Sequence, residues 1–273
     1  MKYKLCVCDM DGTLLNSNGV ISNENERVLK QLQEKGIDVI IASGRTDLMM
    51  KPYIKQLNLK GHIICCNGAM IKHISKNEIV YSKSIEKDIA IMALKYCMDN
   101  KLNFLIYTDD MVYSNLNNPR AKIFEQLNIE LPQDLRVPIS YFTYDDYKMF
   151  EAKKIIKILL IENDDELRNK YAGYFSKFSD LSVVSSAKGL LDIWASGVSK
   201  GSAIKVLSEI LNIDLGTVVA FGDNYNDIEM FQTAGMPIAM GNAVDELKKV
   251  AKHVTLSNDE DGIAYAWRHI IEN

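Results

Sequence analysis

The chain has 273 residues, of which 47% are hydrophobic and 25% are charged. This balance is typical of a globular protein with a sizeable core and argues against disorder. The length exceeds what one compact core usually needs, so two modules are expected. The formal net charge is −4 and no segment concentrates Lys and Arg, which excludes the basic footprint of a nucleic-acid or anionic-membrane binder. Small molecules are therefore the expected partners, and nothing indicates an obligatory protein partner.

The first residues and the cysteines bear on where the protein works. Met1-Lys2-Tyr3-Lys4 leads into an apolar run of only four residues, which is too short for the core of a signal peptide, and no later run approaches a membrane span. The five cysteines form no Cys-x-x-Cys or Cys/His zinc spacing, so buried, reduced thiols are expected. These features predict a cytoplasmic protein without a membrane anchor.

The first quarter of the chain alternates between strand and helix patterns. Apolar runs predict three strands, over residues 5–8, 38–42 and 62–66. Asn23 followed by Glu26 predicts the start of a helix between the first two strands, and Gly36 predicts its end. This order indicates a parallel sheet with helices on its faces, and such sheets bind ligands beyond the carboxyl ends of their strands. Polar residues that directly follow the strands are therefore the candidate site.

After Asn67-Gly68 the pattern changes to a hairpin and then to a mixed segment over 84–194. Predicted helices cover residues 86–100, 119–127 and 165–178, and predicted strands cover residues 71–74, 79–81, 104–108, 155–161, 181–185 and 190–194. Beyond Ser199 the β-α rhythm returns, with a helix from Lys200, a strand over 218–221, a helix through Met230 and a strand over 237–240. The sequence predicts an α/β protein in which a Rossmann-like parallel-sheet core, 1–83 and 195–273, carries an inserted α+β domain.

Two carboxylates stand at the end of the first predicted strand, in Asp9-Met10-Asp11-Gly12-Thr13. The glycine allows the backbone to turn sharply there. Attack on phosphorus needs such a pair, because one carboxylate can act as the nucleophile while the other donates a proton to the leaving oxygen. An acidic turn without chemistry is the alternative.

Two further segments follow strands of the same predicted sheet. Ser43-Gly44-Arg45 offers a hydroxyl and backbone N–H groups that could hold a phosphoryl oxygen, although a Ser-Gly turn that opens a helix is common. Gly222-Asp223-Asn224-Tyr225-Asn226-Asp227 brings more acidic groups to the same edge. Converging carboxylates repel one another unless a cation lies between them, and Mg²⁺ fits oxygen ligands beside a phosphate. The spacing lacks the alternating ligands of an EF-hand calcium loop.

Lys200 stands at the start of the helix with which the chain re-enters the core. Its ammonium and the N–H groups of that helix start could both face an anion. A solvated surface lysine is the alternative.

These segments, in this order and with an insertion between the second and third, resemble the haloacid dehalogenase superfamily of phosphotransferases. The resemblance runs the whole length and is closest to the Cof-type branch, which has an inserted C2-type cap. It is carried by Cys66-Asn67-Gly68-Ala69, Gly197-Val198-Ser199-Lys200-Gly201, Phe221-Gly222-Asp223-Asn224 through Ala234-Gly235, Ala239-Met240-Gly241-Asn242-Ala243 and Asp259-Glu260-Asp261-Gly262.

The resemblance implies a role for each matching residue. Asp9 would be the nucleophile and a Mg²⁺ ligand, and Asp11 the general acid and base as well as a metal ligand through its backbone carbonyl. Asp223 would complete the metal shell, and Asp227 would hold Lys200 or a metal-bound water. The implied phosphate and substrate contacts are Met10 through its backbone, Thr13, which also steadies the loop, Ser43, Gly44, Lys200 and Asn226.

The expected function is that of a Mg²⁺-dependent phosphatase that hydrolyses a small phosphorylated metabolite through an aspartyl-phosphate intermediate. A phosphosugar mutase and a non-catalytic phosphate-binding protein are the alternatives. The inserted domain, residues 84–194, is expected to read the leaving group. Asp192, Trp194 and the segment 113–120 are candidate readers, although core or surface roles are favoured for each. A sugar phosphate, a nucleotide, a flavin and pyridoxal phosphate all suit this chemistry.

Overall fold

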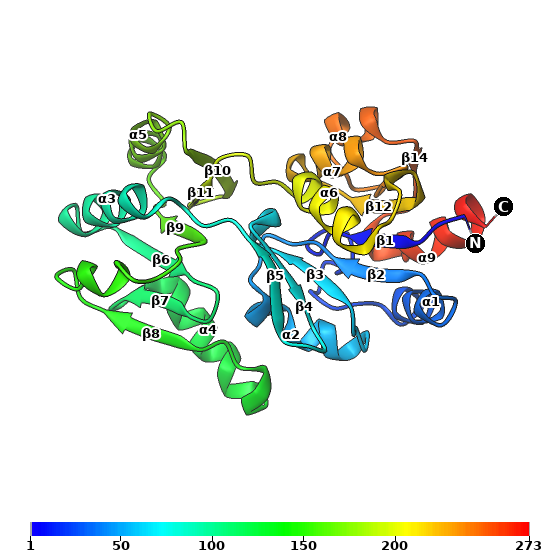
Figure 1. Cartoon of the computed structure of the whole chain (residues 1–273), viewed down its shortest axis with the longest axis horizontal. Coiled ribbons are helices and arrows are strands. Elements are labelled where there is room, and N and C mark those ends of the chain that lie inside the picture. The colour runs from blue at the N-terminus through cyan, green and yellow to red at the C-terminus, as the bar shows by residue number, and fades with distance from the viewer. Residues whose placement is uncertain (1, 273) are drawn as a thin grey trace. The chain divides into compact units, whose positions relative to one another are not determined.

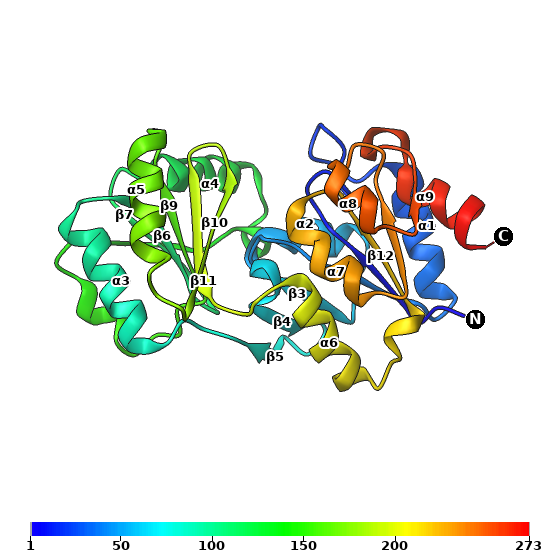
Figure 2. The ribbon, with the colours of Figure 1, turned by 90° about the horizontal axis from the view of Figure 1, so that it is seen from above.

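The computed structural model describes residues 2–272, except for the side chains of Tyr147, Ser186 and Ala187. The chain divides into two compact units (Figures 1 and 2). One unit comprises the residues up to Tyr81 together with those from Ser199 onward, and the other is Ser82–Val198.

The first unit is built on a five-stranded sheet with the order β14-β13-β12-β1-β2. Its strands are β1 (Leu5–Cys8), β2 (Asp38–Ile41), β12 (Val218–Gly222), β13 (Met236–Ala239) and the two-residue β14 (His253–Val254). All neighbouring pairs are parallel. Every residue of β1 and β12 is buried, which explains their unbroken apolar sequences, because a parallel sheet is covered on both faces. The predicted parallel α/β core is confirmed.

The third predicted strand belongs mainly to a second, three-stranded sheet with the order β3-β4-β5. Its strands are β3 (His62–Cys65), β4 (Met70–His73) and β5 (Glu78–Ser82). An isolated parallel bridge between Ala42 and Ile64 joins β3 to the end of β2, and the Ser43 N–H donates to the Ile64 carbonyl at 2.9 Å. The chain that follows β3 is therefore held beside the chain that follows β2.

Helices cover both faces of the five-stranded sheet. Figure 1 shows α6 (Lys200–Leu211), α7 (Ile228–Thr233) and α8 (Asp245–Val250) on one side, and α1 (Asn23–Glu34) and α9 (Gly262–Ala266) on the other. Helix α2 (Asp47–Gln56) follows β2, and α9 continues into a π-helical turn, Trp267–Ile271. Short 3₁₀ turns cover Cys66–Gly68, Gln133–Leu135, Tyr147–Phe150, Leu215–Thr217, Tyr225–Asp227 and Asn258–Glu260.

The predicted start of a helix at Asn23 is confirmed, and the structure shows which residue caps it. The helix begins at Asn23, but its N-cap is Ser22, whose side chain accepts from the Asn25 N–H at 3.2 Å. Glu26 does not complete a capping box with Asn23, because its carboxylate is bound by Lys30 and Gln56. The N-cap therefore lies one residue before Asn23, where serine offers the same kind of side-chain acceptor as asparagine.

The second unit carries a six-stranded sheet with the order β10-β11-β9-β6-β7-β8. Its strands are β6 (Asn103–Tyr107), β7 (Val112–Asn115), β8 (Ile139–Phe142), β9 (Lys157–Ile161), β10 (Leu181–Ala187) and β11 (Leu190–Ala195). Its helices are α3 (Lys87–Asp99), α4 (Pro119–Glu130) and α5 (Asp165–Phe175). Ile193, Ile158 and Ile106 lie opposite one another on three neighbouring strands and pack against α3 and α5. The expected α+β composition is confirmed.

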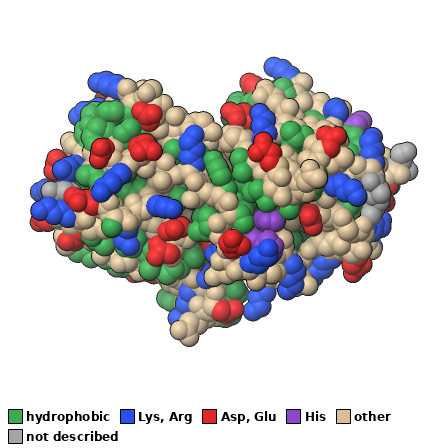
Figure 3. Space-filling model, viewed as in Figure 1, with side chains coloured by type: hydrophobic (Ala, Val, Ile, Leu, Met, Phe, Trp, Pro, Cys, Tyr) green, Lys and Arg blue, Asp and Glu red, His purple; other side chains and the backbone are tan. Residues whose placement is uncertain are grey.

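Acidic and basic side chains are interspersed on the face drawn in Figure 3, in keeping with a sequence that gathers no Lys/Arg-rich segment. Within residues 2–272, no helix is both long enough and apolar enough to cross a bilayer.

Candidate active site

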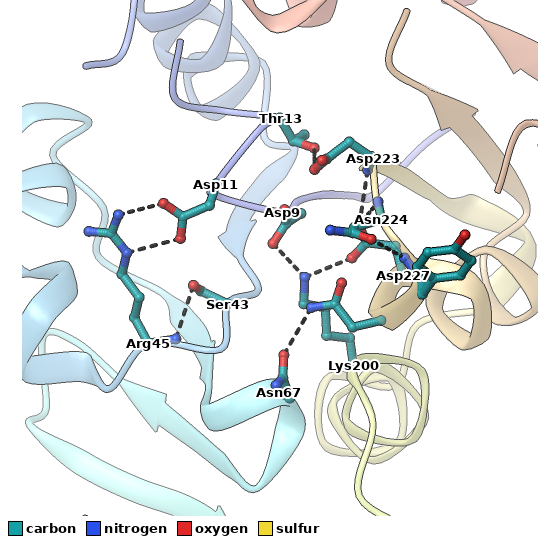
Figure 4. A network of polar contacts seen from close by, with 12 residues as sticks. Asp9, Asp11, Thr13, Ser43, Arg45, Asn67, Lys200, Asp223, Asn224 and Asp227 are labelled. Carbon is teal, nitrogen blue, oxygen red and sulfur yellow. Dashed lines mark hydrogen bonds and ion pairs between the residues drawn. The ribbon is translucent and has the colours of Figure 1, made fainter. Parts of the chain in front are cut away.

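The carboxyl end of β1 is the point at which the order of the sheet reverses. The chain leaves β1 for β2 on one side, while β12 packs against β1 on the other. Ligands of open α/β sheets bind in the crevice beyond such a point. Asp9 follows β1, Ser43 lies just beyond β2, and Asp223 follows β12. Figure 4 shows these three side chains around one region, together with Lys200 from the start of α6.

Lys200 is fully buried at the start of α6. Its ammonium forms ion pairs with the carboxylates of Asp9 and Asp227, the latter at 2.7 Å. The preceding residue, Ser199, caps the helix, because its side chain accepts from the Ser202 N–H at 2.9 Å and the Ser202 hydroxyl bonds back to the Ser199 N–H. A buried ammonium is tolerated only where anions neutralise it. Lys200 is therefore not the solvated lysine that the sequence left open.

Burial and charge both perturb the titrating groups of this cluster. Burial raises the pKa of Asp9 well above its ordinary value, despite the opposing pull of Lys200, and Asp227 and Asp223 raise it further. Burial likewise raises the pKa of Asp223. Burial lowers the pKa of Lys200, but Asp227 and Asp9 outweigh it, so the net pKa is raised. One ammonium thus faces three carboxylates, which leaves an excess of negative charge.

The three carboxylates could hold a cation. Asp9, Asp223 and Asp227 each offer one oxygen, and these atoms lie within 4.8 Å of one another. Asp227 is already well satisfied: one oxygen binds Lys200, and the other accepts from the backbone N–H groups of Asp223 and Asn224 at 2.9 and 3.1 Å. Asp9 and Asp223 are therefore better placed to coordinate an ion. A donor set made only of oxygens fits a hard divalent cation such as Mg²⁺.

The loop after β1 is fitted tightly against Asp223. Gly12 has φ +83°, and a Cβ there would lie 2.4 Å from an Asp223 carboxylate oxygen, so only glycine is accommodated. Thr13 is fully buried, and its hydroxyl donates to Asp223 Oδ1 at 2.8 Å. The Thr13 hydroxyl thus steadies a carboxylate of the cluster as well as its own loop.

Asp11 is turned away from Asp9 (Figure 4). Both of its oxygens accept from the guanidinium of Arg45, at 3.0 Å from Nε and 2.5 Å from Nη2. The Arg45 guanidinium also lies 5.7 Å from the centre of the Tyr53 ring. Arg45 directly follows Ser43-Gly44, but the sequence predicts no role for it, because spacing does not reveal which carboxylate an arginine meets. It is a site residue that sequence reasoning missed.

The remaining predicted phosphate contacts differ in how far they are buried. Ser43 is buried, and its hydroxyl oxygen accepts from the Arg45 N–H at 3.1 Å. Asn226 is exposed, and its amide donates to Asn67 Oδ1 at 3.1 Å. The Met10 side chain is fully buried, which leaves only its backbone for contacts.

The candidate readers of the leaving group lie in the second unit, where Asp192, Tyr113 and Trp194 are all buried. Asp192 is buried and forms an ion pair with Lys157 on the neighbouring strand. Tyr113 packs in the hydrophobic core of this unit, which favours the core role that the sequence left open. Trp194 is buried at the end of β11.

Comparison with known proteins places this chain among hydrolases. The sequence model of the haloacid dehalogenase-like hydrolases matches residues 6–267. The chain therefore belongs to the haloacid dehalogenase-like hydrolase family, as its motifs predicted.

Similar proteins with names show which kind of hydrolase the chain resembles. The phosphatase YwpJ of Bacillus subtilis is 32% identical over 98% of this chain and 100% of its own length. A second B. subtilis protein, the 5-amino-6-(5-phospho-D-ribitylamino)uracil phosphatase YwtE, is 31% identical over 96% of both chains. The crystal structure of a haloacid dehalogenase-like hydrolase from Bacteroides thetaiotaomicron has a TM-score of 0.86 and 29% identity, and the match covers 98% of this chain and 100% of that one. The protein is a phosphoric monoester hydrolase of this family.

Proposed function

We propose that this protein is a Mg²⁺-dependent phosphatase that hydrolyses a small phosphorylated metabolite through an aspartyl-phosphate on Asp9, and that it works in the cytoplasm. The observation that carries the proposal is the ion pair of buried Lys200 with Asp9 beside Asp223, at the switch point of a parallel sheet. This arrangement offers a nucleophile, a cation for the phosphoryl oxygens and ligands for a metal within one small region.

The first chemical step joins Asp9 to the substrate. A carboxylate oxygen of Asp9 attacks phosphorus, the bond from phosphorus to the leaving oxygen breaks, and Asp11 donates a proton to that oxygen. Asp11 must give up at least one of its two hydrogen bonds to Arg45 to reach the leaving group, because both oxygens are engaged. Lys200 and the Ser43 hydroxyl stabilise charge on the equatorial phosphoryl oxygens, because the hydroxyl accepts from the Arg45 N–H and keeps its own proton to donate.

The second step frees the enzyme. Asp11 accepts a proton from water as the water oxygen bonds to phosphorus, and the bond between phosphorus and Asp9 breaks to release inorganic phosphate. Asp227 keeps Lys200 in place throughout, since it pairs with the same ammonium as Asp9. Asn226 contributes a further amide to the phosphate.

Mg²⁺ would be held by the side chains of Asp9 and Asp223 and by the backbone carbonyl of Asp11. When bound, it neutralises phosphate charge and the excess negative charge of the carboxylate cluster.

The proposed substrate class is that of small phosphorylated metabolites. YwtE is named for one such compound, and YwpJ is named as a phosphatase. We assign reading of the leaving group to the inserted α+β domain, residues 84–194. The phosphatase names of the relatives favour hydrolysis over the mutase alternative.

The test is hydrolysis of p-nitrophenyl phosphate followed by a panel of phosphorylated metabolites. We expect turnover that requires Mg²⁺, is lost on chelation with EDTA and returns when the ion is added back. Asp9→Asn should abolish turnover without lowering the melting temperature substantially. Isomerised sugar phosphate without released phosphate would establish a mutase instead, and Mg²⁺-independent turnover would contradict the proposed metal role.

A further inference from the structure

The turn between β3 and β4 has an unusual backbone. Cys66 and Asn67 both have positive φ angles, 51° and 55°, although neither is a glycine. Asparagine adopts this left-handed conformation more readily than most residues, whereas cysteine does not. Two such residues in succession persist only where the surrounding structure holds them, and such positions cluster at functional sites. Neither residue takes part in the proposed chemical steps.

The turn is clamped to the loop that follows β2. The Asn67 N–H donates to the Ser43 carbonyl and the Cys66 N–H donates to the Arg45 carbonyl, both at 2.9 Å. Gly44 lies between these two contacts, and a Cβ at Gly44 would come within 3.2 Å of Asn67 Oδ1 and 3.3 Å of its Nδ2. The Asn67 amide therefore packs directly over the backbone of the Ser43-Gly44 segment.

The same amide reaches the opposite side of the candidate phosphate site. Asn67 Oδ1 accepts from Asn226 Nδ2 at 3.1 Å, across 159 positions of sequence. Asn67 is largely buried, whereas Asn226 is exposed. A single buried carboxamide thus contacts both segments that are proposed to bind the phosphoryl oxygens.

We propose that Asn67 is a positioning residue of the phosphate site. It fixes the Ser43-Gly44 loop with its backbone and orients the Asn226 amide with its side chain, so that both segments meet one phosphoryl group. The left-handed turn is the conformation that brings the backbone N–H and the carboxamide of Asn67 to the site together. This inference rests on the proposed function.

Two substitutions separate the side chain from the backbone. Asn67→Gly tolerates the left-handed conformation and removes only the carboxamide. Asn67→Asp keeps an acceptor for Asn226 but places a negative charge near the phosphate. We expect Asn67→Gly to raise the KM for p-nitrophenyl phosphate and the inhibition constant of inorganic phosphate by about tenfold or more. Hydrogen bonds to a charged ligand are expected to weaken by this amount when the groups that make them are no longer held in place. Asn67→Asp should raise both constants further, and the Mg²⁺ requirement should stay the same.

Asn77 supplies the matched control. It is an exposed asparagine with φ 50° in the turn between β4 and β5 of the same unit. Asn77→Gly and Asn77→Asp make the same chemical and backbone changes away from the site, so both should leave KM and phosphate inhibition unchanged.

The double variant Asn67→Gly with Asn226→Ala tests the route of the effect. If Asn67 acts through Asn226, the combined rise in the inhibition constant should be smaller than the product of the two single effects. If the inhibition constant of the double variant rises by the full product of the two single effects, Asn67 does not act through Asn226.

A folded Asn67→Gly variant that binds phosphate as tightly as wild type would overturn the whole inference. If wild type itself showed no turnover, the proposed function would fail, while phosphate binding measured by calorimetry would still decide the role of Asn67.

Discussion

At the scale of single residues, the chemistry at Asp9 depends on how its charge is balanced. Within residues 2–272, Lys200 supplies the ammonium that pairs with Asp9, and the same ammonium also pairs with Asp227. The carboxyl groups of Asp9 and Asp223 have raised pKa values because burial disfavours their charged forms. A cation that binds here must therefore compete with protons for the same oxygens.

This competition predicts that Mg²⁺ binds more tightly as pH rises. Carboxyl groups with raised pKa values keep their protons to higher pH than free carboxyl groups, so at lower pH more protons must be displaced when the ion binds. Between about pH 5 and about pH 8 the apparent affinity should increase, by up to about tenfold per pH unit for each proton displaced. Calorimetry in buffers of different ionisation enthalpy should detect proton release. An affinity independent of pH over this range would show that Asp9 and Asp223 are already ionised.

Replacing Arg45 tests whether its contact with Asp11 matters for proton transfer to the leaving group. If it positions Asp11 as the proton donor, Arg45→Met should lower kcat/KM for an alkyl phosphate by about 10-fold to 100-fold, within the range of general acid catalysis. The loss should be much smaller for p-nitrophenyl phosphate, because p-nitrophenolate leaves without needing a proton. Arg27→Met is the control, since Arg27 is exposed and pairs with Glu24 on α1. Equal losses on both substrates would mean that Arg45 does not act through Asp11.

Sequence patterns found some residues of the site and missed others for a physical reason. Asp9, Ser43 and Asp223 were located because parallel strands end at one edge of a sheet, which is a property of the backbone. Arg45 and Asn67 lie in quoted motifs, yet their contacts depend on side-chain rotamers and on a left-handed turn. Strand and helix periodicity carries no information about either.

At the scale of elements, α6 connects helix stability to the site through its first residues. Ser199 caps the helix and Lys200 follows it directly. Ser199→Ala should destabilise the protein by about 1 kcal/mol, the usual effect of losing such a cap. It should also weaken inhibition by inorganic phosphate, because the start of α6 sets the position of the Lys200 backbone.

The control for this prediction is Ser22→Ala. Ser22 caps α1 with the same side chain, accepting from the Asn25 N–H. Urea unfolding should show a similar loss of stability for both variants, and only Ser199→Ala should change phosphate inhibition. If Ser22→Ala weakened phosphate inhibition equally, the effect would be a general consequence of lost stability.

Strands were predicted correctly where their sequences form an unbroken apolar run, and they were missed where polar and apolar residues mix. Leu5–Cys8 was predicted with its observed bounds, because a fully buried strand is an unbroken apolar run. Val112–Asn115 and Ile139–Phe142 were missed, since each is short and mixes polar with apolar residues. The two-residue strand His253–Val254 is exposed and carries no alternation to detect.

At the scale of the whole molecule, each of the two units contains one of the two tryptophans. Trp194 lies in β11 of the second unit, and Trp267 lies at the start of the π-helical turn in the first. Both indole rings are buried. Trp194→Phe therefore leaves a fluorescence probe of the first unit, and Trp267→Phe leaves a probe of the second.

These probes predict unequal responses to ligand. Ligands that bind only the folded site stabilise it, by about 2.7 kcal/mol at a concentration 100 times the Kd. Mg²⁺ with inorganic phosphate should raise the urea midpoint reported by Trp267 more than the midpoint reported by Trp194. Equal shifts would mean that the two units unfold as one cooperative body.

The proposed reaction requires a bond between phosphorus and an Asp9 carboxylate oxygen, and chemical trapping detects that bond. Borohydride reduces an acyl phosphate to an alcohol, so a phosphorylated aspartate would become homoserine. Mass spectrometry of Asp11→Asn protein, reacted with p-nitrophenyl phosphate and Mg²⁺ and then reduced, should find this change at position 9 alone. If the wild-type protein is active but the reduced Asp11→Asn protein is unmodified at Asp9, phosphate does not pass through Asp9. Modification at another residue would exclude Asp9 as the nucleophile in the same way.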